Sequence, residues 1–178
     1  MKQLLLICAV VVGQSVLAAD KKPLTKEESA KVVEAAIRRA ANKPTGELTK
    51  ADYEKVTKLY LHDNQLTNVK GLEKLTQLEE LYLYGNKLTD VKGLEKLTKL
   101  KRLSLQNNQL TDVTGLEKLT QLTWLNLWNN RLTELKGLEK LTQLKTLNLI
   151  ENPDLTKAQI AELQKALPNC RIISNPTT

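Results

Sequence analysis

Few residues in this sequence have the chemistry of a catalytic group. The chain has 178 residues with one histidine, His62, and two cysteines, Cys8 and Cys170. Asp63 follows His62, but neighbouring residues of a strand point to opposite sides. The two side chains therefore form a base and its orienting carboxylate only with the help of a turn. We expect His62 to be a contact residue rather than a general base.

The usual sequence motifs of enzymes are missing as well. The chain contains no G-x-S-x-G, no G-x-x-x-x-G-K, no C-x-x-C and no H-E-x-x-H. A single histidine excludes a site built from several histidines, and the Asp and Asn residues lack the spacing of a calcium loop. The sequence predicts a protein that is not an enzyme and uses no cofactor and no metal.

Aromatic residues recur in a pattern that favours binding. Five of the six aromatic residues, and the histidine, fall at three positions that repeat every 22 residues. Each position lies beside a leucine, so in a strand with buried leucines it faces the opposite, concave side. The three columns are Lys58, Glu80, Arg102, Trp124 and Thr146; Tyr60, Tyr82, Ser104, Asn126 and Asn148; and His62, Tyr84, Gln106, Trp128 and Ile150.

Large aromatic side chains and arginine dominate the energetics of interfaces. We expect the aromatic members of the columns to supply apolar contact area, and four polar members to give selectivity. The aromatic set is Tyr60, Tyr82, Tyr84, Trp124 and Trp128, and the polar set is His62, Arg102, Gln106 and Asn126. The alternative is that the rings stack along the sheet and only stabilise it. We favour binding, because stacking alone does not require exposed tryptophans.

The elements that position these residues are repeats. The chain has 36 leucines, and its asparagines recur every 22 residues at Asn64, Asn86, Asn108, Asn130 and Asn152. Within each turn an L-x-L pair has the period of a short strand with one buried face. The leucines that follow at a spacing of three suit a tight helical or extended return segment. One turn cannot bury its leucines alone, so about five turns must stack into a solenoid with a continuous core.

The repeated asparagines and glycines are explained by the needs of the backbone. An asparagine amide both donates and accepts, so it can satisfy peptide groups where the chain leaves the strand. Glycine recurs at Gly71, Gly93, Gly115 and Gly137, which indicates a positive φ or a close approach of two backbones.

These residues resemble the bacterial leucine-rich-repeat family, in the 22-residue class that includes internalins. The pattern L-x-x-L-x-L-x-x-N-x-L-T-D-V-x-G-L is explicit in residues 78–94 and 100–116, and the resemblance covers about residues 53–155. It implies an α/β solenoid with short parallel strands on the concave face and helical caps at both ends. In this family a closing L-P-N-C segment, here Leu167 to Cys170, commonly seals the C-terminal end.

Both flanks of the repeat region have the sequence of helical caps. Thr25 and Glu28 form a capping box before an apolar helical stripe, and we assign residues 20–52 to an N-terminal cap. The stripe comprises Val32, Val33, Ala36, Ile37 and Ala40. Thr156 and Gln159 form a second box, so we expect the solenoid to end at residue 155 and residues 156–178 to form a C-terminal cap and tail.

The first 19 residues have the sequence of a secretory signal peptide. Lys2 precedes a short apolar segment, and Val16-Leu17-Ala18 suits cleavage after Ala18 or Ala19. We expect an exported protein, periplasmic or secreted, with no transmembrane segment in the mature chain. Cleavage removes Cys8, which leaves Cys170 either as a buried small hydrophobic residue or as one half of an intermolecular disulfide.

Charge narrows the set of partners. The formal net charge is +7, but the return segments read Gly-Leu-Glu-Lys-Leu and so alternate in sign. Nucleic acid favours an unbroken basic stripe, so we expect no nucleic-acid partner. The sequence predicts a monomeric module that binds a protein or peptide through its concave aromatic face. Envelope carbohydrate binding and a structural spacer without a ligand are the alternatives.

Overall fold

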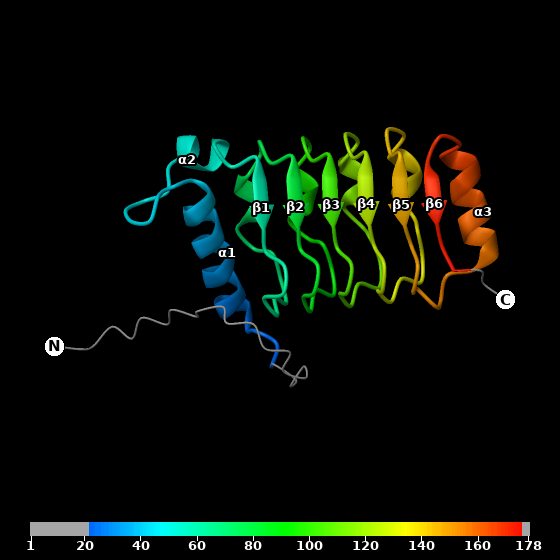
Figure 1. Cartoon of the computed structure of the whole chain (residues 1–178), viewed down its shortest axis with the longest axis horizontal. Coiled ribbons are helices and arrows are strands. Elements are labelled where there is room, and N and C mark those ends of the chain that lie inside the picture. Colours follow the sequence, from blue (N-terminus) through cyan, green and yellow to red (C-terminus); the bar gives the residue numbers. More distant parts are fainter. Residues whose placement is uncertain (1–21, 176–178) are drawn as a thin grey trace, which may run out of the picture.

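The computed structural model describes residues 22–175 and contains one parallel sheet of 6 strands in sequence order (Figure 1). The strands lie side by side along one face of an elongated stack, and all of them run in the same direction. Their bounds are β1 (Lys58–Tyr60), β2 (Glu80–Tyr82), β3 (Arg102–Ser104), β4 (Trp124–Asn126), β5 (Thr146–Asn148) and β6 (Arg171–Ile173). The predicted leucine-rich-repeat solenoid with parallel strands is confirmed.

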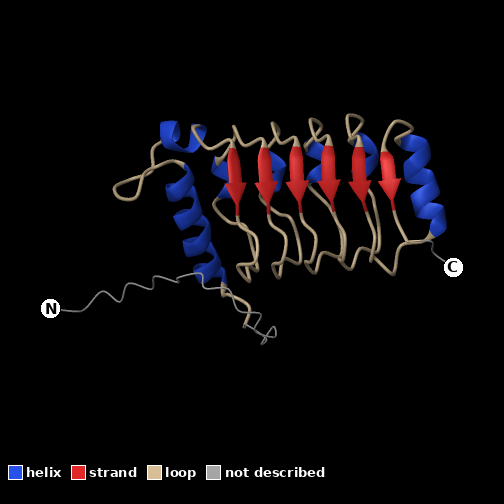
Figure 2. Cartoon of the chain, viewed as in Figure 1, coloured by secondary structure: helices blue, strands red, loops and turns tan. Residues whose placement is uncertain are grey.

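Short 3-10 helices lie behind the sheet, where the sequence predicts a tight return segment (Figure 2). They are η1 (Leu72–Lys74), η2 (Leu94–Lys96), η3 (Leu116–Lys118) and η4 (Leu138–Lys140). Leucines from strands and return segments fill the space between the two layers. In one turn Leu81, Leu83, Leu88, Leu94 and Leu97 are all fully buried. Each turn covers the leucines of the next, so the core is continuous along the stack.

The glycine column starts each 3-10 helix. Gly71, Gly93, Gly115 and Gly137 have φ between 97° and 105°, as the sequence predicts. The N–H of each glycine donates to the carboxylate of the glutamate two residues later, at 2.6–2.7 Å. The hydrogen bond from each glutamate's own N–H, followed by that from the glycine, holds the pKa of Glu95 and Glu117 below its ordinary value. The glutamates of the Gly-Leu-Glu-Lys segments therefore stabilise the turns. The alternation of acidic and basic residues in these segments did not predict this role.

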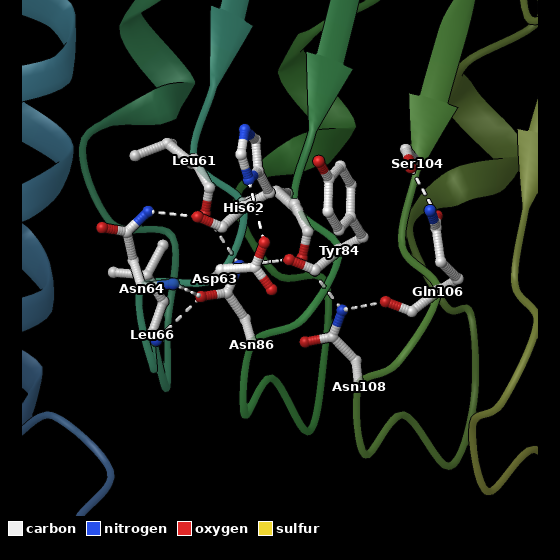
Figure 3. A network of polar contacts seen from close by, with 11 residues as sticks. Leu61, His62, Asp63, Asn64, Leu66, Tyr84, Asn86, Ser104, Gln106 and Asn108 are labelled. Atoms are coloured by element: carbon white, nitrogen blue, oxygen red, sulfur yellow. Dashed lines mark hydrogen bonds and ion pairs between the residues drawn. The ribbon is translucent and has the colours of Figure 1, made fainter. Parts of the chain in front are cut away.

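The asparagine column connects consecutive turns (Figure 3). The Nδ2 of Asn86 donates to the carbonyls of Leu61 and Leu83, both at 2.8 Å. Its Oδ1 accepts from the N–H of Asn64 at 3.1 Å and of Leu66 at 3.0 Å. The pattern recurs at Asn108, Asn130 and Asn152. The Nδ2 of each donates to a carbonyl of the preceding turn, and its Oδ1 accepts from the N–H of the residue two positions after the preceding asparagine.

Helices cover both ends of the stack. The predicted capping boxes are confirmed: Thr25 begins α1 (Lys26–Ala40), and Thr156 begins α3 (Lys157–Ala166). Val33 and Ile37 of α1 are buried, but Ala40 is exposed and Ala41 is buried in its place. The predicted apolar stripe is therefore wrong at its last residue.

The sequence did not predict the short helix α2 (Lys50–Glu54). Thr49 and Asp52 form a third capping box at its start. Tyr53, which we assigned to the first repeat turn, lies in this helix and packs against the core. The helix has only 5 residues, too few for a recognisable apolar period.

The C-terminal cap contains one strand more than the sequence predicted. Residues Arg171–Ile173 form β6, which pairs in register with β5. Our expectation that this region is only a helix and tail is therefore corrected, because Cys170 and Ile172 pack on the last repeat as its leucines pack on one another. Cys170 is a buried free thiol and burial raises its pKa, which supports the small-hydrophobic interpretation over an intermolecular disulfide.

Asp52 makes the start of α2 sensitive to acid. Hydrogen bonds from the side chain and backbone of Thr49, and from Lys55, lower the pKa of Asp52 to about 2. The folded state therefore favours the ionised carboxylate. Its contribution to stability is complete above the pKa of the unfolded chain and is lost as the pH falls toward 2. We expect Asp52→Asn to lower the free energy of unfolding at pH 7 and to lower it much less near pH 2, where the folded carboxyl is partly protonated, as measured by urea denaturation. An equal loss at both pH values contradicts this prediction.

No helix within residues 22–175 is long and apolar enough to cross a membrane. The predicted signal peptide at residues 1–19 lies outside the described residues.

Candidate binding surface

The strand register aligns the first two columns on one side of the sheet, and the third column lies in the segments that directly follow the strands. Lys58 pairs with Glu80, Glu80 with Arg102, and Arg102 with Trp124, and the second column is aligned in the same way. We call this side the strand face. All nine residues that the sequence predicts for binding lie on it or in the segments that directly follow the strands.

Four rings form an aromatic cluster on β1 and β2. Tyr60 stacks on Tyr82 with ring centroids 5.0 Å apart, and His62 stacks on Tyr84 at 4.5 Å. Tyr60 also meets His62 edge to face at 6.3 Å. Stacking along the ladder, the alternative to binding, is therefore present here. Tyr60 nevertheless remains 55% exposed, whereas Tyr82 and Tyr84 are half-buried.

An ion pair of Lys58 and Glu80 borders this cluster, and neither residue was predicted as a site residue from the sequence. Lys58 Nζ lies 3.0 Å from Glu80 Oε2, and the Tyr82 hydroxyl donates to the same oxygen at 2.7 Å. The hydrogen bond from Tyr82, followed by that from Lys58, lowers the pKa of Glu80. Lys58 Nζ is also 5.2 Å from the centre of the Tyr60 ring. Lys58 and Glu80 both belong to the first column, but the sequence does not show that they pair. Their contact forms because two neighbouring strands bring together residues that are 22 positions apart in the chain.

The tryptophans form a second group, on and after β4. The Arg102 guanidinium lies over the Trp124 ring, 5.0 Å from its centre. Trp124 and Trp128 are both half-buried rather than exposed, so our expectation of exposed tryptophans is wrong. Trp124 is partly covered by the Arg102 guanidinium of the neighbouring strand, which lies over its ring.

Polar residues near the tryptophans form hydrogen bonds with neighbouring residues of their own repeat. Asn126 Oδ1 accepts from the Trp128 N–H at 3.0 Å, which fixes the chain as it leaves β4. The hydroxyl of Ser104 donates to Gln106 Oε1, and Ser104 is only 2% exposed. Among these residues Arg102 keeps an exposed side chain, while Gln106 and Asn126 are half-buried.

His62 and Asp63 lie in contact, contrary to the expectation from strand geometry. His62 Nδ1 is 3.0 Å from Asp63 Oδ2 (Figure 3). Asp63 has φ of 58°, so the chain turns between the two residues and brings the side chains to the same side. In residues 22–175 the imidazole contacts Asp63, Tyr60 and Tyr84, and no serine or cysteine side chain hydrogen-bonds to it. The pair therefore lacks the nucleophile of a catalytic triad.

Gly85 provides the space for the Asp63 carboxylate. A Cβ at residue 85 would overlap with Asp63 Oδ1, and Gly85 has φ of 68°. The next two repeats have asparagine at this position with positive φ, at Asn107 and Asn129. We expect Gly85→Asn to lower the free energy of unfolding by about 1 kcal/mol. In an Asp63→Ala background we expect the same substitution to cost less, by about 0.5 kcal/mol or more. Urea denaturation of the four proteins tests this coupling, and equal costs in both backgrounds would show that the carboxylate is not the obstacle.

Comparisons with known proteins agree with the repeat and its stacking. A family model described as leucine-rich repeats in two copies matches residues 54–96, 76–118 and 120–165. The chain therefore belongs to the leucine-rich-repeat family. No curated protein sequence matches it significantly.

Several solved structures have a similar fold. The internalin InlF of Listeria monocytogenes aligns with a TM-score of 0.75 and 29% identity, over 83% of this chain and 43% of the internalin. A leucine-rich-repeat protein of Leptospira interrogans aligns at 0.61 and 34% identity, over 71% of this chain and 33% of that protein. The functional domain of InlJ from Listeria monocytogenes aligns at 0.61 and 25% identity, over 78% of this chain and 35% of that domain. The chain thus resembles the internalins in fold and spans less than half the length of these relatives.

Proposed function

We propose that this protein is a non-enzymatic binding module that recognises a protein or peptide through its strand face. The observation that carries the proposal is that Tyr60, Tyr82 and Trp124 lie on one side of the sheet, with Tyr84 and Trp128 in the segments that directly follow the strands. Aromatic residues and arginine form the high-energy contacts of protein interfaces. A preformed surface also loses little conformational entropy when it binds. The internalin-like fold is consistent with this role, although fold alone does not select a ligand.

The residues have separate roles in this proposal. Tyr60 is 55% exposed and offers apolar contact area, and the Arg102 guanidinium lies over the ring of the half-buried Trp124. His62, Gln106 and Asn126 supply the polar contacts that give selectivity. Lys58 and Glu80 add a charged pair at the border of the aromatic cluster.

Affinity capture from an envelope extract of the source organism tests the strand face. We expect the folded Trp124→Ala/Trp128→Ala variant to lose the captured species, with a loss of at least about 2 kcal/mol in binding free energy. Tyr60→Ala should weaken capture, whereas Tyr53→Ala should not, because Tyr53 is the one aromatic residue away from the strand face. If all variants capture the same material, the strand face is not the site.

Carbohydrate binding is the second candidate. Tyr60 stacks on Tyr82 through one ring face and is 55% exposed, so its other side could take a sugar ring. Competition by soluble envelope glycans separates the two classes of ligand. If instead the aromatic substitutions change only the free energy of unfolding and no interaction, the module is a spacer whose rings stabilise the sheet.

We also propose that the protein is exported, since residues 1–19 have the sequence of a signal peptide. N-terminal sequencing of the mature protein should find Ala19 or Asp20 as its first residue. An unprocessed Met1 in the mature protein would contradict export by this route.

A further inference from the structure

β1 is the first strand of the sheet, and its outer edge lies beside α1, with a groove between the two. In a parallel sheet, alternate residues of a strand direct their backbone groups to opposite neighbours. Residues 57 and 61 face β2: the N–H of Glu80 donates to the Thr57 carbonyl at 3.1 Å, and that of Leu61 to the Tyr82 carbonyl at 2.8 Å. The backbone groups of Lys58 and Tyr60 therefore face outward. Within residues 22–175 no hydrogen bond reaches them.

A groove runs along this edge. It has a volume of about 330 Å³ and lies between β1 and the C-terminal end of α1, where Ala36, Arg39 and Ala40 form the opposite wall. Residues 55–60 form the wall on the strand side, and two of them, Val56 and Leu59, are buried core residues that give it an apolar base. Tyr60 stands at the rim and is the exposed large hydrophobic residue of the described chain.

The charged residues that line this groove are all basic. Arg39, Lys55 and Lys58 line it, and no acidic residue is among the residues that line it. Lys55 pairs with Asp52 at 3.2 Å and Lys58 with Glu80 at 3.0 Å. The exposed Arg39 has no ion pair in the part of the chain that the structure describes. Lysine on an edge strand opposes pairing with arbitrary apolar strands, and the same charge favours an acidic one.

We propose that this edge binds an extended acidic peptide segment of another protein, which joins the sheet as an additional strand beside β1. The outward N–H and C=O groups of Lys58 and Tyr60 supply the main-chain hydrogen bonds, and the cations of the groove select acidic side chains. Alternate side chains of the added strand lie beside Tyr60 on the strand face. The proposal uses the sheet edge rather than the tryptophans and does not depend on the proposed function.

Amide hydrogen exchange measured by NMR tests the first step. In the free protein we expect the amides of Lys58 and Tyr60 to exchange on the order of 100-fold faster than those of Leu59 and Leu61, which face β2. Slow exchange at residues 58 and 60 in the free monomer would overturn the proposal, because the edge would then already be covered.

The second step uses the synthetic peptide acetyl-Glu-Val-Asp-Val-Thr-Val-Glu-amide as the probe. We expect it to slow exchange at residues 58 and 60. Two peptides are expected not to bind: the same sequence with N-methylated backbone amides, and the sequence with lysine at the acidic positions. Equal binding of the N-methylated peptide would overturn strand addition, and so would a lack of any effect of the acidic peptide.

Variants of the protein locate the peptide in the groove. Arg39→Glu should lower affinity for the acidic peptide by about two- to fivefold at low salt, as expected for an exposed charge pair. Lys118→Glu, the same change of charge on the exposed surface of η3, should leave the affinity unchanged. Protection of residues 58 and 60 that rises with protein concentration, together with a doubled mass and no peptide, would assign the edge to a second copy and overturn the proposal.

Discussion

Asn108→Ala is expected to lower the free energy of unfolding by about 3 kcal/mol or more. The Asn108 side chain donates to the carbonyls of Leu83 and Leu105, both at 3.0 Å, and accepts from the N–H of Leu88 at 3.1 Å. These three groups lie in the buried interior between two turns. Alanine leaves them without partners, and an unpaired buried polar group costs about 1 to 3 kcal/mol. Urea denaturation followed by tryptophan fluorescence measures the loss.

Asn64→Ala is the matched control, because Asn64 begins the same column but is only half-buried. Within residues 22–175 its side chain makes one hydrogen bond, to the His62 carbonyl at 2.6 Å. We expect a loss of about 1 kcal/mol or less. Asn108→Asp should be at least as destabilising as Asn108→Ala, because a carboxylate cannot donate to the two carbonyls. Equal losses at residues 64 and 108 would refute the idea that the column joins buried turns.

Leu103→Ala is expected to lower the free energy of unfolding by about 3 kcal/mol, within the range for a leucine in a core that cannot fully collapse. Leu103 is fully buried and lies in register between Leu81 and Leu125. Each turn is stabilised mainly by its two neighbours, so a cavity at this central strand weakens contacts on both sides. Calorimetry and urea denaturation both measure the change.

Ile172→Ala is the comparison at the end of the stack. Ile172 is half-buried in β6 and pairs in register with Leu147 of β5 alone. We expect Ile172→Ala to lower the free energy of unfolding by about 1 kcal/mol, because only part of the Ile172 side chain is buried. If Leu103→Ala proves no more costly than Ile172→Ala, the stability of this solenoid does not depend on position in the stack.

The strand face was predictable from the sequence because each of its columns repeats with the period of the leucines. In an L-x-L strand the side on which a residue lies follows from its place in the repeat, so Tyr82 and Trp124 could be placed without coordinates. The candidate site was therefore predicted as a surface. Its division into an aromatic cluster and an arginine–tryptophan group was not, because ring contacts such as that of Tyr60 with Tyr82 depend on rotamers and strand spacing.

The sequence by itself determined the repeat, the buried leucines, the glycine and asparagine columns and the capping boxes of α1 and α3. Each is a pattern of residue types that recurs, or stands at a helix start, with a fixed spacing in the sequence. The tertiary structure alone decided three other features. Arg171–Ile173 becomes a strand only because β5 offers an edge with which it pairs. Asp63 reaches His62 because its backbone adopts a positive φ. The exposure of the tryptophans depends on side chains from other turns, whose types and rotamers differ from repeat to repeat and so do not follow from the repeat pattern.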